Sequence, residues 1–289
     1  MKCISTDMDG TLLNKDQRVS EENRKALEAV VENGGQVIVA TGRSYKEARL
    51  ALDEINFTCP IISMNGAAVY DEQGTLIASH PLEHSELKET ISYLAQTGVY
   101  FEMYTNQGVF SKNPEKAIDS LVDIFLSANP SLKEEDVRQY AKDRLRYGFL
   151  FETDDYDSLI NETDIEFYKI LVFSPDHSEL DVISESLRKM EGLTVTSSGA
   201  GNIEVNKKGI SKGTALTTLL NQLDIQLEDT MAIGDNYNDV SMFEKAGLSV
   251  AMGNASSEIK SLCKEVTETN EENGVAAAVY KYIIPSLTK

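Results

Sequence analysis

Carboxylates stand at two points of the sequence with a spacing that suits phosphoryl transfer. Asp7 and Asp9 lie two residues apart in the segment DMDGT, and Asp235 and Asp239 lie in the segment GDNYND. A carboxylate can attack a phosphoryl group to form an aspartyl phosphate, although alone it would repel the anionic substrate. A hard divalent cation on oxygen ligands removes this repulsion, so Mg²⁺ is the expected ion. Asp9 is a second carboxylate that could protonate the leaving oxygen and then activate water.

One ammonium group and one hydroxyl stand where they could help to hold a phosphate. Lys212 lies in the segment GISKGT, which opens a predicted helix over Ala215 to Leu223, so the cation lies close to backbone amides that attract anions. Thr41 ends a β-rich run and offers a hydroxyl. These groups can spread the negative charge of a phosphoryl group during transfer.

Several short β-rich runs are each followed by turn residues and a helical pattern, which indicates parallel βα units. Ligands bind beyond the carboxyl ends of such strands, and the carboxylate segments named above each follow one, as do Thr41, Gly42, Arg43 and Asn65. The predicted strands are Cys3 to Thr6, Gln36 to Thr41, Pro60 to Asn65, Thr230 to Gly234 and Ser249 to Gly253, with helices over Ser20 to Asn33 and Tyr45 to Ile55.

The middle of the chain has a different order of predicted elements, with strands and helices that fit an α+β module. The sequence therefore predicts an α/β fold, in which a doubly wound, mainly parallel sheet (a Rossmann-like core) carries an inserted α+β cap domain. The expected boundaries are 1–83 for the first part of the core, 84–206 for the insertion and 207–289 for the second part. The apolar residues Leu121, Ile124 and Phe125 are expected in the core of the insertion.

The composition excludes several classes of protein. The 289 residues carry 27 Lys and Arg against 47 Asp and Glu, a formal net charge of −20, which would repel nucleic acid. No apolar run approaches the roughly 18 residues of a membrane helix, and the first residues do not resemble a signal peptide. The three cysteines are widely spaced and form no CxxC motif, so no disulfide framework or thiolate zinc site is expected. We expect a cytoplasmic protein.

Three alternative motifs fail on spacing or composition. An EF-hand loop starting at Asp7 would need glycine and glutamate where the chain has Leu12 and Arg18. A phosphate-binding Walker loop needs glycine directly before Lys212, where the chain has Ser211. The GxSxG pattern around Ser211 would need a later histidine for a serine hydrolase, but the last histidine of the chain is His177.

The residues resemble the haloacid dehalogenase-like hydrolase superfamily. Its first motif, DxDG[TS], is matched by DMDGT, and its second, a strand-terminal Ser or Thr, by Thr41. Its third motif, a lysine, is matched by Lys212, and its fourth, GDxxxD, by GDNYND. The order of the motifs, their wording and the long insertion between the second and third are similar to the Cof-type subfamily.

The resemblance implies a role for each matched residue. Asp7 would be nucleophile and Mg²⁺ ligand, Asp9 acid/base and ligand through its backbone carbonyl, and Asp235 the third protein ligand. Asp239 would orient a metal-bound water or Lys212 from outside the ligand set. The residues expected to hold phosphate or substrate are Met8, Thr41, Gly42, Arg43, Asn65, Lys212 and Asn238.

The reaction expected from this resemblance is Mg²⁺-dependent hydrolysis of a small phosphorylated metabolite through an aspartyl phosphate on Asp7. Sugar phosphates, flavin mononucleotide and pyridoxal phosphate all remain open as substrates. Two other functions also remain open at this stage, a receiver-like phosphate-binding signalling module and a sugar phosphomutase or phosphotransferase. We infer no nucleic-acid, membrane or obligate protein partner.

Overall fold

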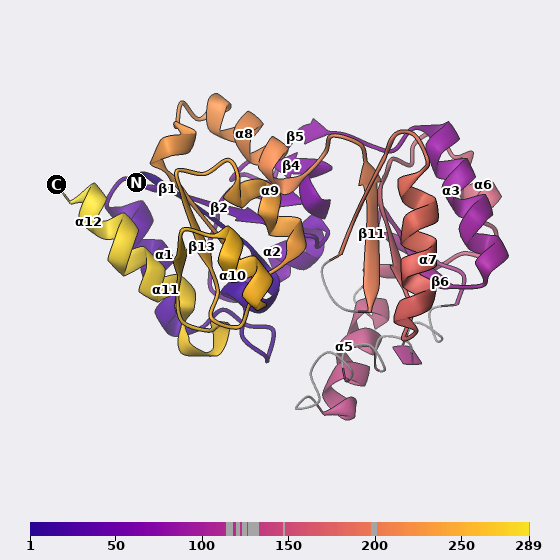
Figure 1. The fold of residues 1–289 in the computed structure, drawn as a ribbon, viewed down its shortest axis with the longest axis horizontal. Helices are drawn as coiled ribbons and strands as arrows, with labels where there is room; N and C mark the ends of the chain where they lie inside the picture. Colours follow the sequence, from indigo (N-terminus) through magenta and orange to yellow (C-terminus); the bar gives the residue numbers. More distant parts are fainter. Residues whose placement is uncertain are drawn as a thin grey trace. The chain divides into compact units, whose positions relative to one another are not determined.

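A computed structural model describes residues 1–113, 118, 119, 122, 126, 133–146, 148–197 and 201–288. The chain forms two compact units: unit 1 consists of Met1–Ser79 and Ile210–Lys289, and unit 2 of His80–Gly209 (Figure 1). The domain boundaries expected from the sequence, after residues 83 and 206, stay a prediction. Leu121, Ile124 and Phe125, expected in the core of the insertion, lie outside the described residues.

Unit 1 is built on an eight-stranded sheet. Strand β1 lies inside it and pairs in parallel with β2 on one side and β12 on the other, with Cys3 opposite both Gln36 and Thr230. Strand β4 pairs antiparallel with both β3 and β5, whereas the strands from β14 to β3 pair in parallel. In spatial order the strands are β14 (Glu265–Val266), β13 (Leu248–Ala251), β12 (Thr230–Gly234), β1 (Cys3–Thr6), β2 (Gln36–Ala40), β3 (Ile61–Ser63), β4 (Ala68–Tyr70) and β5 (Leu76–Ser79).

Helices cover both faces of this sheet. Successive strand residues point to opposite faces, so Ile4 packs in one hydrophobic cluster and Cys3 in the other. The first cluster includes apolar residues of α1 (Glu21–Glu32), α2 (Tyr45–Asp53) and α11 (Gly274–Ala278); the second includes those of α8 (Lys212–Gln222), α9 (Val240–Phe243) and α10 (Ser257–Leu262). A short α12 (Ile284–Leu287) lies beside α1 near the carboxyl end (Figure 1). The doubly wound, mainly parallel α/β fold predicted from the sequence is confirmed.

Side-chain caps set the start of the helices that follow the first two strands. Ser20 caps α1 by accepting a hydrogen bond from the Asn23 amide, and Ser44 forms a capping box with Glu47 at the start of α2. Both helices begin within one residue of their predicted positions, because an oxygen-bearing cap residue is visible in the sequence.

Unit 2 is an α+β module, as expected. Its six-stranded sheet carries α3 (His84–Thr97), α6 (Tyr156–Ile160) and α7 (His177–Arg188), whose apolar residues share one hydrophobic cluster with the sheet. Helix α5 (Glu134–Arg146) contacts strand β8. In spatial order the strands are β10 (Leu193–Thr196), β11 (Asn202–Lys207), β9 (Phe167–Phe173), β6 (Tyr100–Thr105), β7 (Val109–Ser111) and β8 (Leu150–Glu152).

The sheet of unit 2 also buries charged side chains, on residues that alternate with those of the hydrophobic cluster. Lys169 of β9 bonds Glu204 of β11, with 3.0 Å from Nζ to Oε1, and both side chains are almost completely buried. The Lys169 ammonium also lies 4.4 Å from the centre of the Tyr104 ring. Nothing in the sequence marks these residues, since an isolated Lys or Glu in a strand is more often exposed.

None of the described helices combines the length and the apolar character that crossing a bilayer requires.

Helix α8 approaches α9 so closely that the position between them tolerates no side chain. A Cβ atom built on Gly213 would lie 1.9 Å from the carbonyl oxygen of Ser241, and the Gly213 amide donates to the Ser241 hydroxyl at 3.0 Å. Gly213 is the second residue of α8, directly after Lys212, so this close packing fixes the point where the lysine enters the core.

We expect Gly213→Ala to destabilise the protein, although alanine favours helices more than glycine does by about 1 kcal/mol. Overpacking against the Ser241 carbonyl outweighs this gain, and the free energy of unfolding should fall by about 2 kcal/mol. Urea-induced unfolding measures the change. Thr218→Ala, at an exposed position of the same helix, is the control and should leave the midpoint almost unchanged. An unchanged or more stable Gly213→Ala protein contradicts the prediction.

Candidate active site

A buried ammonium group joins two carboxylates at the carboxyl edge of the unit 1 sheet. Lys212 Nζ lies 2.6 Å from Oδ1 of Asp7 and 2.7 Å from Oδ1 of Asp239. Asp7 follows β1, Asp239 follows β12, and Lys212 is the first residue of α8. All three side chains are almost completely buried, so the first, third and fourth sequence motifs meet in one buried cluster.

The electrostatics of this cluster are dominated by burial. Loss of solvation raises the pKa of the Asp7 carboxyl well above its ordinary value; the Lys212 ammonium opposes this shift, and Asp239 and Asp235 add to it. The pKa of Asp235 is raised to about 7, first by burial and then by the Asp239 carboxylate. Burial lowers the pKa of Lys212, but the two carboxylates that it bonds outweigh burial and raise the pKa above its usual range.

Asp239 links Lys212 to the loop after β12. Its Oδ1 accepts the Lys212 hydrogen bond, and its Oδ2 accepts from the backbone amides of Asp235 and Asn236 at 3.0 and 3.1 Å. Both of its oxygens are therefore engaged by donors of the protein. This arrangement fixes the loop that presents Asp235, and it places Asp239 where it holds Lys212.

Two glycines with positive φ let the segments of the site approach one another. Gly10 has φ +70°, and a Cβ there would lie 2.5 Å from Oδ2 of Asp235. Gly66 has φ +102°, and a Cβ there would lie 2.4 Å from the carbonyl oxygen of Ser211, the residue before Lys212. A side chain at either position would be strained and would push the neighbouring segments apart.

The ends of β2 and β3 supply a second polar group of residues. The Thr41 hydroxyl accepts from the Arg43 amide at 3.1 Å, and the Thr41 carbonyl accepts from the Asn65 amide at 3.0 Å. Asn65 Oδ1 accepts from the side-chain amide of Asn238 at 3.3 Å, which connects this group to the loop after β12. Gly42, partly buried, lies between Thr41 and Arg43.

Met8 and Asp9 lie in different surroundings, although they are neighbours in the chain. The Met8 side chain is completely buried in the apolar cluster on one face of the sheet, so a substrate contact from this residue would have to come from its main chain. The Asp9 side chain is 52% exposed and forms an ion pair with Arg43. Asp9 therefore lies outside the buried cluster of Asp7, Lys212 and Asp239.

Several residues at this edge were missed by the sequence analysis. Thr11 donates its hydroxyl to Oδ1 of Asp235 at 3.3 Å, Asn254 donates to the Gly10 carbonyl at 2.8 Å, and Gln17 accepts a hydrogen bond from Arg43. Thr11 lies within the first motif, DMDGT, so its position in the sequence already points to this edge of the sheet. No pattern in the sequence marks Gln17 or Asn254.

Three carboxylates of the buried cluster and its neighbouring loop could hold a divalent cation. Ligand oxygens of Asp7, Asp235 and Asp239 all lie within 4.8 Å of one another. One ammonium faces these three carboxylates, which leaves an excess of two negative charges when all are ionised, and hard oxygen donors are what Mg²⁺ prefers. Because protein donors engage both oxygens of Asp239, Asp7 and Asp235 are the better candidates to hold the ion.

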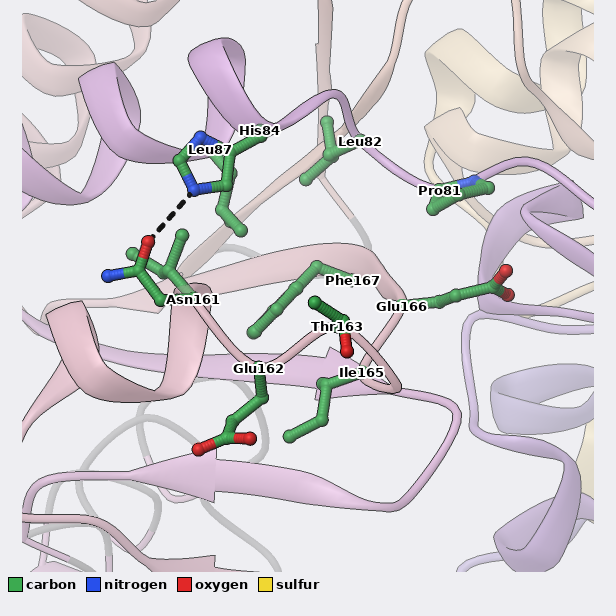
Figure 2. Close-up of a pocket in the computed structure, with 11 residues that line it drawn as sticks. Pro81, Leu82, His84, Leu87, Asn161, Glu162, Thr163, Ile165, Glu166 and Phe167 are labelled. Atoms are coloured by element: carbon green, nitrogen blue, oxygen red, sulfur yellow. Dashed lines mark hydrogen bonds between the residues drawn. The ribbon is translucent and has the colours of Figure 1, made fainter.

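Unit 2 contains a separate pocket of about 240 Å³. Figure 2 shows it between the start of α3 and the loop after α6, with the His84 ring pointing toward Asn161, 3.4 Å from Nε2 to Oδ1. Its lining is mainly apolar and includes two glutamates, Glu162 and Glu166, but no lysine or arginine. This pocket is unsuited to a phosphate, and it includes none of the residues expected from the motifs.

Comparisons with known proteins agree with the motifs. The family described as haloacid dehalogenase-like hydrolase matches residues 4–279. The chain is 36% identical over 278 residues to a protein of Bacillus subtilis (strain 168) named phosphatase YwpJ, covering 96% of this chain and 98% of the relative. It is 37% identical over 277 residues to 5-amino-6-(5-phospho-D-ribitylamino)uracil phosphatase YwtE of the same organism, covering 96% of each chain.

A solved structure is also similar over the whole chain. It is a haloacid dehalogenase-like hydrolase from B. subtilis, with a TM-score of 0.90 and 35% identity, and the match covers 98% of this chain and 100% of the other. With the family, the relatives and the fold in agreement, the chain belongs to the haloacid dehalogenase-like hydrolases of Cof type and is a phosphoric monoester hydrolase.

Proposed function

We propose that this phosphatase hydrolyses its small phosphorylated substrate with the help of Mg²⁺, through an aspartyl phosphate on Asp7. The observation that carries the proposal is the buried Lys212, bonded at 2.6 Å to Asp7 and at 2.7 Å to Asp239. A lysine completely withdrawn from water beside a candidate nucleophile can neutralise charge on both the carboxylate and an incoming phosphate.

Asp7 is the nucleophile in this proposal, and Asp9 serves as acid and then as base. An Asp7 oxygen attacks phosphorus while the bond from phosphorus to the ester oxygen breaks, and Asp9 gives its proton to the departing alcohol. Asp9 then takes a proton from water as the water oxygen attacks phosphorus, and the bond from Asp7 to phosphorus breaks to release phosphate. Thr41, Gly42, Lys212 and Asn238 are the residues proposed to hold the phosphate.

Asp7 and Asp235, with the Asp9 main-chain carbonyl, are the residues proposed to hold Mg²⁺. When bound, the ion would polarise the phosphoryl oxygens and reduce the repulsion between substrate and carboxylates. Burial is the main cause of the raised pKa of Asp7 and of Asp235, and neighbouring carboxylates add to it; a bound cation would stabilise the ionised form of both groups. Asp239 is proposed to orient Lys212 rather than to bind the ion.

The substrate is proposed to be a sugar phosphate or a similar phosphate ester of a polyhydroxylated molecule. YwtE is named for a substrate that carries a phosphorylated ribityl chain, and it shares 37% identity with this protein. A receiver-like signalling module finds no support, since the chain belongs to a family of hydrolases over nearly its whole length. A phosphotransferase differs only in the acceptor and would release a phosphorylated second sugar instead of inorganic phosphate.

We expect Asp7→Asn to abolish turnover of p-nitrophenyl phosphate, with a loss of at least about 10³-fold in kcat, because the amide cannot act as nucleophile. Release of p-nitrophenol measures the activity, and thermal unfolding shows that the protein still folds. The matched control is Asp53→Asn, whose carboxylate is 62% exposed and pairs with Arg49 on α2. Asp53→Asn should keep full activity. Turnover by Asp7→Asn close to that of the unchanged protein would rule out the proposed nucleophile.

Removal of divalent cations should abolish phosphate release, and added Mg²⁺ should restore it. The physical reason is that the carboxylates of Asp7, Asp235 and Asp239 would otherwise repel the anionic ester. The measurement is inorganic phosphate released from a panel of sugar phosphates after treatment with EDTA and then with excess Mg²⁺. Binding of Mn²⁺ followed by electron paramagnetic resonance gives a second readout, which Asp235→Asn should weaken. Activity that persists after exhaustive chelation contradicts the assignment.

A further inference from the structure

Arg43 binds the Asp9 carboxylate at two points. Arg43 Nε donates to Oδ2 of Asp9 at 2.8 Å, and Nη2 donates to Oδ1 at 2.6 Å. The Arg43 side chain is only 13% exposed, while that of Asp9 is 52% exposed. The planar guanidinium matches the two carboxylate oxygens, which gives the pair a defined direction as well as a favourable energy.

The arginine is itself held from several sides. Its amide donates to the Thr41 hydroxyl at 3.1 Å, and its carbonyl accepts from the Met64 amide at 2.9 Å. Its Nη2 also donates to the side-chain oxygen of Gln17. Gln17 has φ +60°, a left-handed conformation in the loop after the first motif that brings its side chain to Arg43. The guanidinium is therefore held in place by contacts on several sides, and it orients the more exposed carboxylate of Asp9.

The two-point contact defines the orientation of the Asp9 carboxylate. Both oxygens face N–H donors, so the carboxylate is held as an acceptor of hydrogen bonds, as a group that receives a proton from water must be. A carboxylate oxygen has more than one lone-pair direction, so a water molecule can donate to it as well. A half-exposed carboxylate without such a partner would instead spread over several rotamers.

We propose that Arg43 is a positioning residue that orients the Asp9 carboxylate for taking a proton from the water that cleaves the aspartyl phosphate. This inference rests on the proposed function, and it gives Arg43 a role other than the substrate contact expected from the family resemblance. In the step concerned, the water oxygen bonds to phosphorus, the bond from phosphorus to the Asp7 oxygen breaks, and the water proton passes to Asp9.

The test is Arg43→Ala with p-nitrophenyl phosphate as the substrate. p-Nitrophenolate leaves without needing a proton, so formation of the phosphoenzyme should be nearly independent of Asp9, while its hydrolysis still needs the base. We expect kcat to fall about tenfold, KM to fall in parallel, and kcat/KM to stay within about twofold. Rapid mixing should show a burst of p-nitrophenol of one equivalent per active site, as the phosphoenzyme accumulates.

Companion variants separate orientation from a general loss of structure. Arg43→Lys keeps the charge but not the two-point fork, so its kcat should lie between those of Arg43→Ala and the unchanged protein. In the Asp9→Asn background, Arg43→Ala should cause no further loss of phosphoenzyme hydrolysis, since the two act as a unit. Arg49→Ala is the matched control, because Arg49 is similarly buried, at 17% exposure, and pairs with Asp53 away from the site.

The result that overturns the proposal is a parallel fall of kcat and kcat/KM in Arg43→Ala without a burst, since Arg43 would then act on substrate binding or on formation of the phosphoenzyme. Unchanged kinetics overturn it as well. Failure of the proposed function is a different outcome, seen as no turnover by the unchanged protein or as full turnover by Asp7→Asn. Thermal unfolding of every variant identifies a fold defect. If Arg43→Ala has such a defect, the kcat and the burst of Arg43→Lys decide whether the proposal stands.

Discussion

The site depends on one interaction, the ammonium of Lys212 buried between the carboxylates of Asp7 and Asp239. An unpaired buried charge costs several kcal/mol, so none of the three groups could stay ionised in this place without the others. The lysine thus stabilises buried carboxylates that would otherwise be unfavourable in this place. The site still has three carboxylates, Asp7, Asp235 and Asp239, for one ammonium, and this excess of negative charge favours the binding of a divalent cation.

The backbone makes this interaction possible by close approach. Lys212 is 205 residues from Asp7 and 27 from Asp239, so no local structure brings them together. The position of β1 between β2 and β12 sets the place of Asp7, while Gly66 and Gly213 remove the Cβ atoms that would keep the start of α8 at a distance. The charged groups are thus positioned by main-chain packing rather than by side-chain length.

Much of the fold could be predicted because its signals are local. The β-rich run Gln36–Ala40 and a cap at Ser20 are read from neighbouring residues, and the rule that ligands gather at the carboxyl ends of parallel strands links Asp7, Thr41 and Asp235 before any contact is known. The place of Lys212 at the start of a predicted helix, together with the third family motif, adds the lysine.

What could not be predicted are contacts between segments whose sequences carry no pattern. The Arg43 fork on Asp9 involves Gln17, whose conformation depends on a loop, and the Lys169–Glu204 pair involves two strands with no polar signal. Met8 shows the same limit, because a motif assigns a position in the chain but not the direction of a side chain, which here points into the core. Packing decides such directions, and packing is not local.

The central place of β1 also has a consequence for how the chain is synthesised. Residues 3–6 can pair with β2 once that strand has been translated, but their other neighbour, β12, begins only at Thr230. Until then one edge of β1 lacks its strand partner, and an unpaired strand edge invites association with other chains. Pairing between segments so far apart in sequence also slows folding, because the loop between them must be closed first. The sheet of unit 1 can therefore be completed only late in translation, whereas unit 2 is a continuous stretch whose strands are all translated before β12.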